Sequence, residues 1–201
     1  MSDAVKPVLA AFDFDGTISI HDTFLPFLFR ACGKMRVAVA LARLSGEAVR
    51  VGLRRSNRDQ FKQRLLMQLL AGDSVARLQQ IGAEHAAQVL ATQLRPAALA
   101  RIAWHRERGH QLIMVSASLD FYLEKIAAAL GFNQLLCTRV AAIDDRCIGG
   151  IIGMNCRGAE KVRQLQFLCG DLTNSVLYAY GDSAGDQELL AAADFPHYRP
   201  F

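Results

Sequence analysis

The sequence predicts an α/β fold: a doubly wound, mostly parallel, Rossmann-like sheet with an inserted all-helical cap domain. Short apolar runs that end in polar residues recur along the chain, as in buried parallel strands. Segments with helical spacing of apolar residues separate these runs. One connection is far longer than a crossover helix needs, because 103 positions separate Asp13 from Ser116. We therefore expect a catalytic core formed by 1–20 and 94–201, and a helical cap formed by 21–93.

In the first half of the chain, residues 8–12 form an apolar run that predicts a buried strand. Helical periodicity then continues to about residue 93, and Gly72-Asp73-Ser74 interrupts it, with Asp73 or Ser74 as the next amino-terminal cap. A further helix is expected from Pro96 to about Arg108, since proline suits a first helical turn.

In the second half, strands and helices are expected to alternate. Glycines and paired aspartates mark the breaks between them. The expected elements are a strand at 111–115, a helix at 119–130, a strand at 134–140, a hairpin around Asp144-Asp145 and Gly149-Gly150, a helix after Gly158 and a strand at 176–180.

The end of the first strand carries two carboxylates, Asp13 and Asp15, followed by Gly16 and Thr17. Residues two apart on a strand face the same way, so both carboxylates should face one cleft at the carboxyl edge of the sheet. Two carboxylates this close repel each other, so either one holds a proton or a cation lies between them. Mg²⁺ with oxygen ligands satisfies this requirement.

Polar residues also follow the later strands, and these should reach the same edge. Ser116 ends the second apolar run, and Asp182 and Asp186 follow the last one. Lys161 falls in the first turn of the helix after Gly158, where it opposes the helix dipole unless it binds an anion. Carboxylates, a hydroxyl and one ammonium together suit a phosphoryl group.

This set of groups predicts phosphoryl transfer by covalent catalysis. Asp13 attacks phosphorus and forms an aspartyl phosphate, while Asp15 acts as general acid and then as general base. We expect Mg²⁺ to be held by Asp13, the main-chain carbonyl of Asp15 and Asp182. Asp186 is not expected to bind the metal itself but to orient a metal-bound water or Lys161.

These residues resemble the four motifs of the haloacid dehalogenase-like hydrolases, and in particular their phosphoserine-phosphatase-like branch (subfamily IB). The motifs are Asp13-Phe14-Asp15-Gly16-Thr17, Ser116, Lys161 and Gly181-Asp182-Ser183-Ala184-Gly185-Asp186, and the resemblance covers about 8–193. It implies a Mg²⁺-dependent phosphomonoesterase with the roles given above. The phosphate ligands are then Thr17, Ser116, Ala117 and Lys161.

The leaving group is less certain than the reaction. Phosphoserine phosphatases carry a glutamate nine residues after the nucleophile, and Asp22 occupies that position here. Asp22 therefore either binds an amino group on a different substrate, such as histidinol phosphate, or serves as the amino-terminal cap of the first helix in the cap domain. The arginine that binds the serine carboxylate has three candidate counterparts in the cap: Arg58, Lys62 and Arg64.

The cap is basic. Residues 30–64 contain ten Lys or Arg and two acidic residues, a net charge of +8 in a chain of +4. Such a cap either steers an anionic substrate or simply presents a solvated face. Basic and apolar residues interleave in it, which leaves a membrane-surface role open. The segment 155–161 is similar to that of phosphatidylglycerophosphate phosphatases, so a lipid phosphatase is one alternative function.

A receiver-like signalling domain is the alternative from another class, since it also groups carboxylates, a hydroxyl and a lysine around Mg²⁺. Its acidic pair and its acceptor lie on different strands, unlike Asp13 and Asp15.

Composition frames these predictions. No apolar run reaches the roughly 20 residues of a membrane span, and no secretory leader precedes the first strand, so we expect a soluble, cytoplasmic protein. The five cysteines form no Cys-x-x-Cys pair, which argues against a zinc site. The expected partner is a small phosphorylated substrate, with no nucleic acid and no stable membrane insertion. The oligomeric state cannot be predicted.

Overall fold

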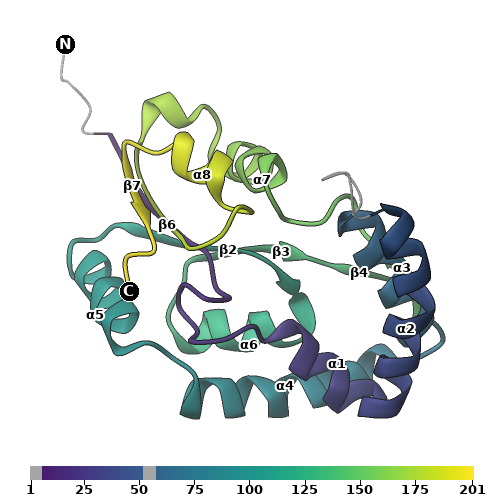
Figure 1. Cartoon of the computed structure of the whole chain (residues 1–201). Coiled ribbons are helices and arrows are strands. Elements are labelled where there is room, and N and C mark those ends of the chain that lie inside the picture. The colour runs from purple at the N-terminus through teal and green to yellow at the C-terminus, as the bar shows by residue number, and fades with distance from the viewer. Residues whose placement is uncertain (1–5, 52–57) are drawn as a thin grey trace.

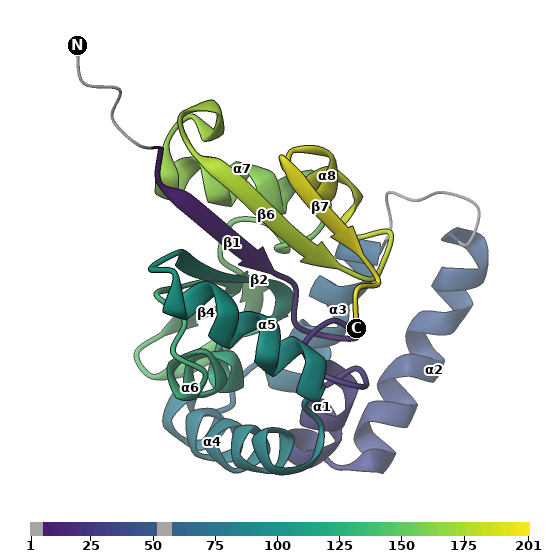
Figure 2. The same cartoon turned by 90° about the vertical axis from the view of Figure 1, so that its left-hand side faces the viewer.

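The computed structural model of the chain describes residues 6–51 and 58–201. Its centre is a five-stranded sheet in the order β3-β2-β1-β6-β7, in which every pairing is parallel (Figure 2). The predicted fold class is confirmed. The strands of this sheet are β1 (Val8–Phe12), β2 (Gln111–Leu119), β3 (Gln134–Thr138), β6 (Val176–Gly181) and β7 (Phe195–Tyr198).

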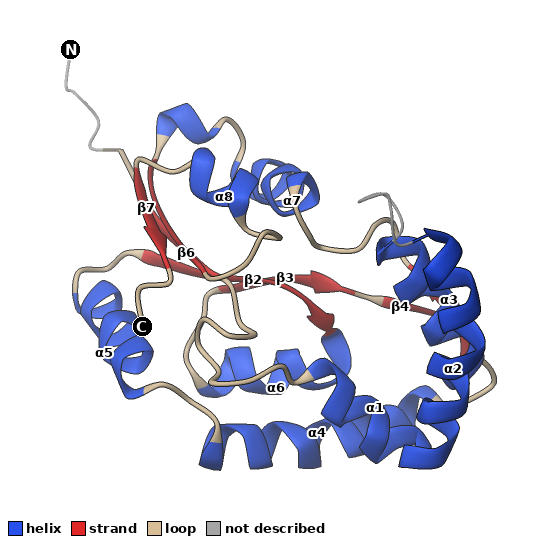
Figure 3. Cartoon of the chain, viewed as in Figure 1, coloured by secondary structure: helices blue, strands red, loops and turns tan. Residues whose placement is uncertain are grey.

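Helices cover both faces of the sheet (Figures 1 and 3). One face carries α7 (Ala159–Cys169) and α8 (Gln187–Ala191), and the other carries α5 (Pro96–Glu107) and α6 (Asp120–Ala129). A short 3-10 turn, Leu172–Asn174, precedes β6. Within 6–51 and 58–201, every helix is too short or too polar to span a lipid bilayer.

The side chains of β1 alternate between the two faces, and this alternation decides where Asp13 points. Ala10 and Phe12 belong to the apolar core under α5 and α6, whereas Leu9 and Ala11 belong to the core under α7 and α8. Asp13 continues the second series, so its carboxylate faces the α7 and α8 side.

The long connection between β1 and β2 is helical where the structure describes it. It contains α1 (Phe24–Cys32), α2 (Lys34–Val51), α3 (Arg58–Leu70) and α4 (Val75–Thr92). Ser74 caps α4, because its Oγ accepts a hydrogen bond from the Arg77 backbone N–H. The basic stretch 30–64 falls on α1 to α3, and 52–57 within it lie outside the described residues. The domain boundaries at 20–21 and 93–94 stay a prediction.

The insertion is packed tightly against the core at Gly82, in the middle of α4. A Cβ atom on Gly82 would lie 2.2 Å from the main-chain oxygen of Phe121 in α6. Only glycine permits this approach of two helix backbones. Helix α4 is therefore held directly against helix α6 of the core.

A β-hairpin from the second half of the chain also contacts the insertion. Strands β4 (Val140–Ile143) and β5 (Arg146–Ile151) pair antiparallel, and the turn between them is made by Asp144 and Asp145, both with positive φ. The Gly149-Gly150 pair that helped to predict this hairpin lies within β5 and not in its turn. Strand β5 packs against α3, so the core contributes a support for the insertion that the sequence did not indicate.

Candidate active site

Three parallel strands deliver polar residues to one edge of the sheet. Phe12 at the end of β1 is paired with Met114 of β2 and Tyr180 of β6. Asp13, Ser116 and Asp182 follow these paired positions by one or two residues. The Asp13 backbone N–H donates to the Tyr180 carbonyl at 2.9 Å, which continues the ladder to the nucleophile position. The strand ends thus meet as the sequence predicted.

The Lys161 side chain is buried at this edge and joins two carboxylates. Its Nζ lies 2.6 Å from Oδ1 of Asp13 and 2.6 Å from Oδ1 of Asp186. Burial alone would lower the pKa of Lys161, but attraction to Asp13 and Asp186 outweighs it and raises that pKa above its ordinary value. Lys161 is therefore a fixed positive charge next to Asp13, the predicted nucleophile.

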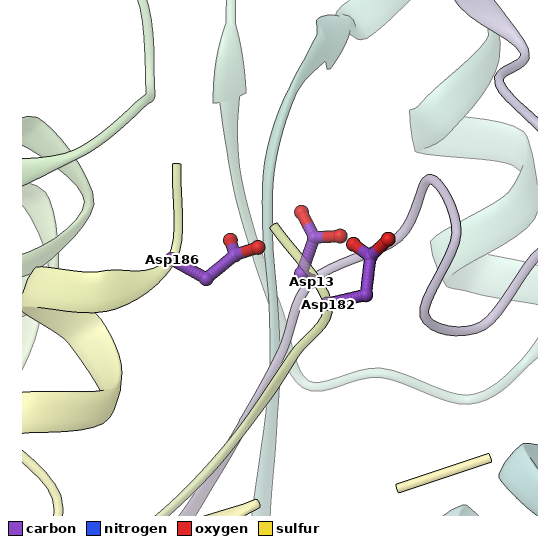
Figure 4. Close-up of side chains that lie close together, drawn as sticks. All are labelled: Asp13, Asp182 and Asp186. Carbon is purple, nitrogen blue, oxygen red and sulfur yellow. The ribbon is translucent and has the colours of Figure 1, made fainter. Parts of the chain in front are cut away.

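Asp13, Asp182 and Asp186 form a compact acidic cluster, in which one carboxylate oxygen from each residue lies within 4.8 Å of the other two (Figure 4). Burial raises the pKa of Asp13 to about 7, Lys161 opposes the rise, and the Asp186 charge adds to it. Burial and Asp186 also raise the pKa of Asp182. Carboxylates crowded in this way need a cation or a proton between them.

Local backbone structure makes room for this cluster. Gly16 has a φ of +83°, and a Cβ atom there would lie 2.4 Å from Oδ2 of Asp182. A side chain at position 16 would therefore displace Asp182 from Asp13. The Asp182 carboxylate receives one long hydrogen bond, at 3.4 Å, from the Thr17 hydroxyl. Its oxygens are mostly available to a cation.

Asp186, in contrast, is fully engaged by the protein. Its Oδ1 accepts from Lys161, and its Oδ2 accepts from the Ser183 backbone N–H at 3.0 Å and the Ser183 hydroxyl at 2.8 Å. These bonds and the Lys161 charge outweigh burial and lower the pKa of Asp186. This geometry suits a residue that holds Lys161 in place.

Asp15 is held by neutral donors. Its Oδ1 accepts from the Thr23 backbone N–H at 2.7 Å and the Thr23 hydroxyl at 2.6 Å, and its Oδ2 accepts from the Ser118 hydroxyl at 2.5 Å. Burial nevertheless raises the pKa of Asp15 above its ordinary value. A raised pKa is what a carboxyl group that donates and accepts protons requires.

A cavity of about 170 Å³ lies over these groups. Its floor includes Asp13, Asp15, Ser116, Lys161 and Asp186. The insertion closes one side with Asp22, Phe24 and Lys62, and Arg157 from the loop before α7 lines it as well. Since one water occupies roughly 30 Å³ of liquid, the space suits a phosphate and a small attached group.

Ser116 and Ala117 both line this cavity. The Ser116 hydroxyl oxygen accepts from the Ser118 backbone N–H at 3.0 Å, which leaves its proton free for a ligand. Thr17, in contrast, lines a separate recess behind the acidic cluster, together with Asp182. The structure therefore sets Thr17 beside Asp182 and apart from the other predicted phosphate ligands, because its hydroxyl bonds that carboxylate.

The predicted specificity residues of the insertion separate into two groups. Lys62 reaches the cavity and donates to the Ala117 carbonyl and, at 2.9 Å, to Asn155 Oδ1. Arg58 and Arg64 are exposed on α3 and are not among the residues that line the cavity, because their positions face away from it. Asp22 lines the cavity, and its Oδ2 also accepts from the Leu25 backbone N–H at 3.1 Å, so the capping interpretation has direct support.

The sequence analysis missed Thr23, Ser118, Asn155 and Arg157. Ser118 lies two residues after Ser116 on the same strand, and the alternation that paired Asp13 with Asp15 would have found it. Asn155 and Arg157 lie in the segment 155–161, for which the sequence analysis noted a family similarity without assigning these two residues a role, and Thr23 had no local signal.

Comparison with known proteins identifies the family. A model of the haloacid dehalogenase-like hydrolases matches residues 10–191, and the chain belongs to this family. The findings therefore support a hydrolase with a phosphatase-type site.

Individual relatives refine this picture. Protein CicA of Caulobacter vibrioides is 36% identical over 98% of this chain and 87% of its own length. A phosphoserine phosphatase of a Polaromonas species is 27% identical over 92% of this chain and 75% of its own length. A Bordetella pertussis protein of unknown function has a solved structure with a TM-score of 0.79 and 25% identity, over 96% of this chain and 89% of that one. The chain is thus similar to the phosphoserine-phosphatase-like branch.

Proposed function

We propose that this protein is a Mg²⁺-dependent phosphomonoesterase that hydrolyses a small phosphorylated metabolite through an aspartyl-phosphate intermediate. The observation that carries the proposal is the position of Asp13 at the end of β1, with Lys161 Nζ at 2.6 Å and the acidic cluster around it. A cytoplasmic location is part of the same proposal.

The acidic cluster fits a magnesium ion. Its donors are carboxylate oxygens, which Mg²⁺ prefers, and burial and Asp186 raise the pKa of Asp182 more than Thr17 and Arg199 lower it. Asp13, Asp182 and the main-chain carbonyl of Asp15 would hold the ion, with Asp186 behind them. When bound, it would neutralise charge on the phosphoryl oxygens.

In the first step, a carboxylate oxygen of Asp13 bonds to phosphorus while the bond from phosphorus to the leaving oxygen breaks. Lys161 and the Ser116 hydroxyl balance the charge on the phosphoryl oxygens. Asp15 gives its proton to the leaving oxygen, which departs as an alcohol. Hydrogen bonds of this kind, aimed at developing charge in a buried site, supply most of the acceleration.

In the second step, Asp15 takes a proton from water, and the resulting attack on phosphorus releases Asp13 and inorganic phosphate. The site must therefore accommodate Asp15 in both its protonated and its ionised form. The Ser118 hydroxyl can turn from donor to acceptor, so Oδ2 of Asp15 can carry the proton without losing its partner. Thr23, through its backbone N–H, keeps Oδ1 fixed in both states.

The test is phosphate release from a panel that contains p-nitrophenyl phosphate, phosphoserine, histidinol phosphate, sugar phosphates and phosphatidylglycerophosphate. We expect turnover of small soluble esters with added Mg²⁺ and none after chelation. Turnover confined to the lipid substrate would favour the lipid phosphatase. A stable aspartyl phosphate without turnover of any substrate would favour a receiver-like function, and activity that survives chelation would overturn the metal assignment.

A further inference from the structure

The cavity contains two cationic side chains that the proposed mechanism does not use. Lys62 comes from α3, Arg157 comes from the loop before α7, and both line the cavity. Lys161 on the floor pairs with two carboxylates. Within the described part of the chain, neither Lys62 nor Arg157 has a carboxylate at ion-pair distance.

Arg157 is positioned by its stem and leaves its charged end free. A Cβ atom on Gly185 would lie 3.1 Å from both Cγ and Nε of Arg157, so the side chain rests on the backbone of the loop before α8. Its guanidinium makes no hydrogen bond with another described residue. A half-buried guanidinium offers five donors in a fork that matches a carboxylate or a phosphate.

Lys62 is bonded only to neutral oxygens. It donates to the Ala117 carbonyl and to Asn155 Oδ1, which uses two of its three N–H groups. Burial lowers the pKa of Lys62 to about 8, and the charges of Asp15, Asp59 and Asp22 offset only part of the lost solvation. The ammonium also lies 4.7 Å from the centroid of the Phe24 ring, and its third N–H has no oxygen partner among the described residues.

Two carboxylates near these cations are bonded to neutral donors of the protein. Asp22 accepts from the Leu25 N–H, and Asp15 on the floor accepts from Thr23 and Ser118, while neither forms an ion pair with Lys62 or Arg157. Among the described charged residues that line the cavity, the Arg157 guanidinium is thus the group without a hydrogen-bond partner in the protein.

We propose that Arg157 and Lys62 form a site for a second anion on the leaving group. The substrate is then a phosphomonoester whose alcohol part carries a carboxylate or a further phosphate and needs no ammonium group. This inference rests on the proposed function and names the substrate class of the same site. The Arg157 guanidinium would bind this anion with two parallel hydrogen bonds, and the Lys62 ammonium would bind it from α3.

The experiment compares matched substrates that differ in one group. Ethyl phosphate has a neutral leaving group, 2-phosphoglycolate adds a carboxylate, 1,2-ethanediol bisphosphate adds a phosphate, and phosphoethanolamine adds an ammonium. We expect kcat/KM for one or both anionic substrates to exceed that for ethyl phosphate by about 10- to 100-fold, as a charge-assisted hydrogen bond allows. Phosphoethanolamine should be no better than ethyl phosphate. The two anionic arms show whether the carboxylate or the phosphate is preferred.

Variants assign the effect to the two side chains. Arg157→Gln should remove most of the preference for the anionic substrate and change kcat/KM for ethyl phosphate by less than about threefold, while Arg157→Lys should restore part of it. Lys62→Gln should give a smaller loss of the same kind. Arg139→Gln and Lys125→Gln remove exposed charges elsewhere and serve as controls. Circular dichroism and thermal melting check that each variant is folded.

Several outcomes would overturn this inference while the proposed function stands. The wild-type enzyme would show no preference for a second anion, or Arg157→Gln would slow all substrates equally, which would make Arg157 a ligand of the transferred phosphoryl group. Calorimetric binding of the same substrates to Asp13→Asn gives an answer that does not depend on turnover. Loss of Mg²⁺-dependent hydrolysis of every ester, with selective binding retained, would reject the proposed reaction and keep the anion site.

Discussion

The floor of the cavity and its wall hold their charged groups in different ways. On the floor, Lys161 lies 2.6 Å from the carboxylates of both Asp13 and Asp186, and Ser183 fixes Asp186 in turn. On the wall, Lys62 is bonded to neutral oxygens, and the Arg157 guanidinium has no partner within the described residues. Apart from the cation that we propose for the acidic cluster, the charges on the floor are paired within the protein, whereas the Arg157 guanidinium on the wall is left for a bound group. Under our two proposals, the floor would set the reaction and the wall would set the choice of substrate.

The strongest test of this comparison is Asp13→Asn on the floor. The amide cannot attack phosphorus, so we expect turnover to fall by at least about 10⁴-fold on every substrate, as when a covalent nucleophile is removed. Substrate binding measured by calorimetry should persist, because the wall is untouched. Appreciable residual turnover would remove Asp13 from the nucleophile role.

Removal of a metal ligand should have the next largest effect. Asp182→Asn is expected to weaken Mg²⁺ binding by about 10- to 100-fold and to regain activity partly in excess Mg²⁺. The shift of thermal melting temperature with Mg²⁺ concentration measures this affinity without turnover. Asp194→Asn, on a carboxylate that accepts from the Leu177 N–H away from the cavity, is the control. An unchanged Mg²⁺ response in Asp182→Asn would contradict the assignment.

The aromatic layer beneath the floor should make stability depend on pH. Tyr180 stacks on Phe12 at a centroid distance of 4.2 Å, and His105 Nε2 lies 2.8 Å from the Tyr180 hydroxyl. Burial, followed by the neighbouring His110, lowers the pKa of His105 to about 4. In the unfolded chain this histidine has its ordinary pKa of about 6.5. Below that pH the unfolded chain therefore carries more protons than the folded protein, and acid favours unfolding.

The contribution of His105 to the free energy of unfolding should accordingly be greatest above about pH 6.5. As the pH falls to 5, the free energy of unfolding should decrease by roughly 2 kcal/mol from this residue alone. Urea denaturation at pH 7.5 and pH 5 measures the difference. His105→Phe should flatten this slope, even though it also leaves the Tyr180 hydroxyl without its partner. A slope that is unchanged in the variant would show that other groups titrate.

The smallest effect is expected where the insertion meets the hairpin. Ser74→Ala removes the cap of α4 and the hydrogen bond at 3.0 Å to Asp145 Oδ2, and should lower the free energy of unfolding by about 1 kcal/mol. Activity on all substrates should stay as it is, because neither floor nor wall is altered. A changed substrate preference would mean that the hairpin positions α3 and with it Lys62.

The sequence predicted the floor better than the wall, and the reason is physical. Asp13, Ser116 and Asp182 each end a local apolar run, and parallel strands bring such ends together whatever else the chain does. The break at Gly72 likewise predicted a cap at Asp73 or Ser74, and Ser74 is the residue that caps α4. These signals lie within a few residues of the groups that they predict.

The wall depends on contacts between distant segments. Asn155 is joined to Lys62 and Asp59 of α3 and to Thr138 of β3, which lie 93, 96 and 17 residues away. No local pattern indicates which side chains of α3 turn inward, so Arg58 and Arg64 could not be separated from Lys62. Thr17 was predicted as a phosphate ligand from the family resemblance, and no sequence pattern indicated that its hydroxyl donates to Asp182.

The close approach of α4 to α6 at Gly82 limits how the protein can admit a substrate. The insertion cannot swing away as one rigid lid unless these two backbones separate, and that would expose apolar surface along the whole length of α4. Helix α3 is held just as closely, because a Cβ atom on Gly149 of β5 would lie 2.4 Å from Cα of Met67 in α3. Two close backbone approaches, α4 on α6 and α3 on β5, therefore fix both ends of the insertion, and Lys62 is presented to the cavity from a helix that is anchored to the core.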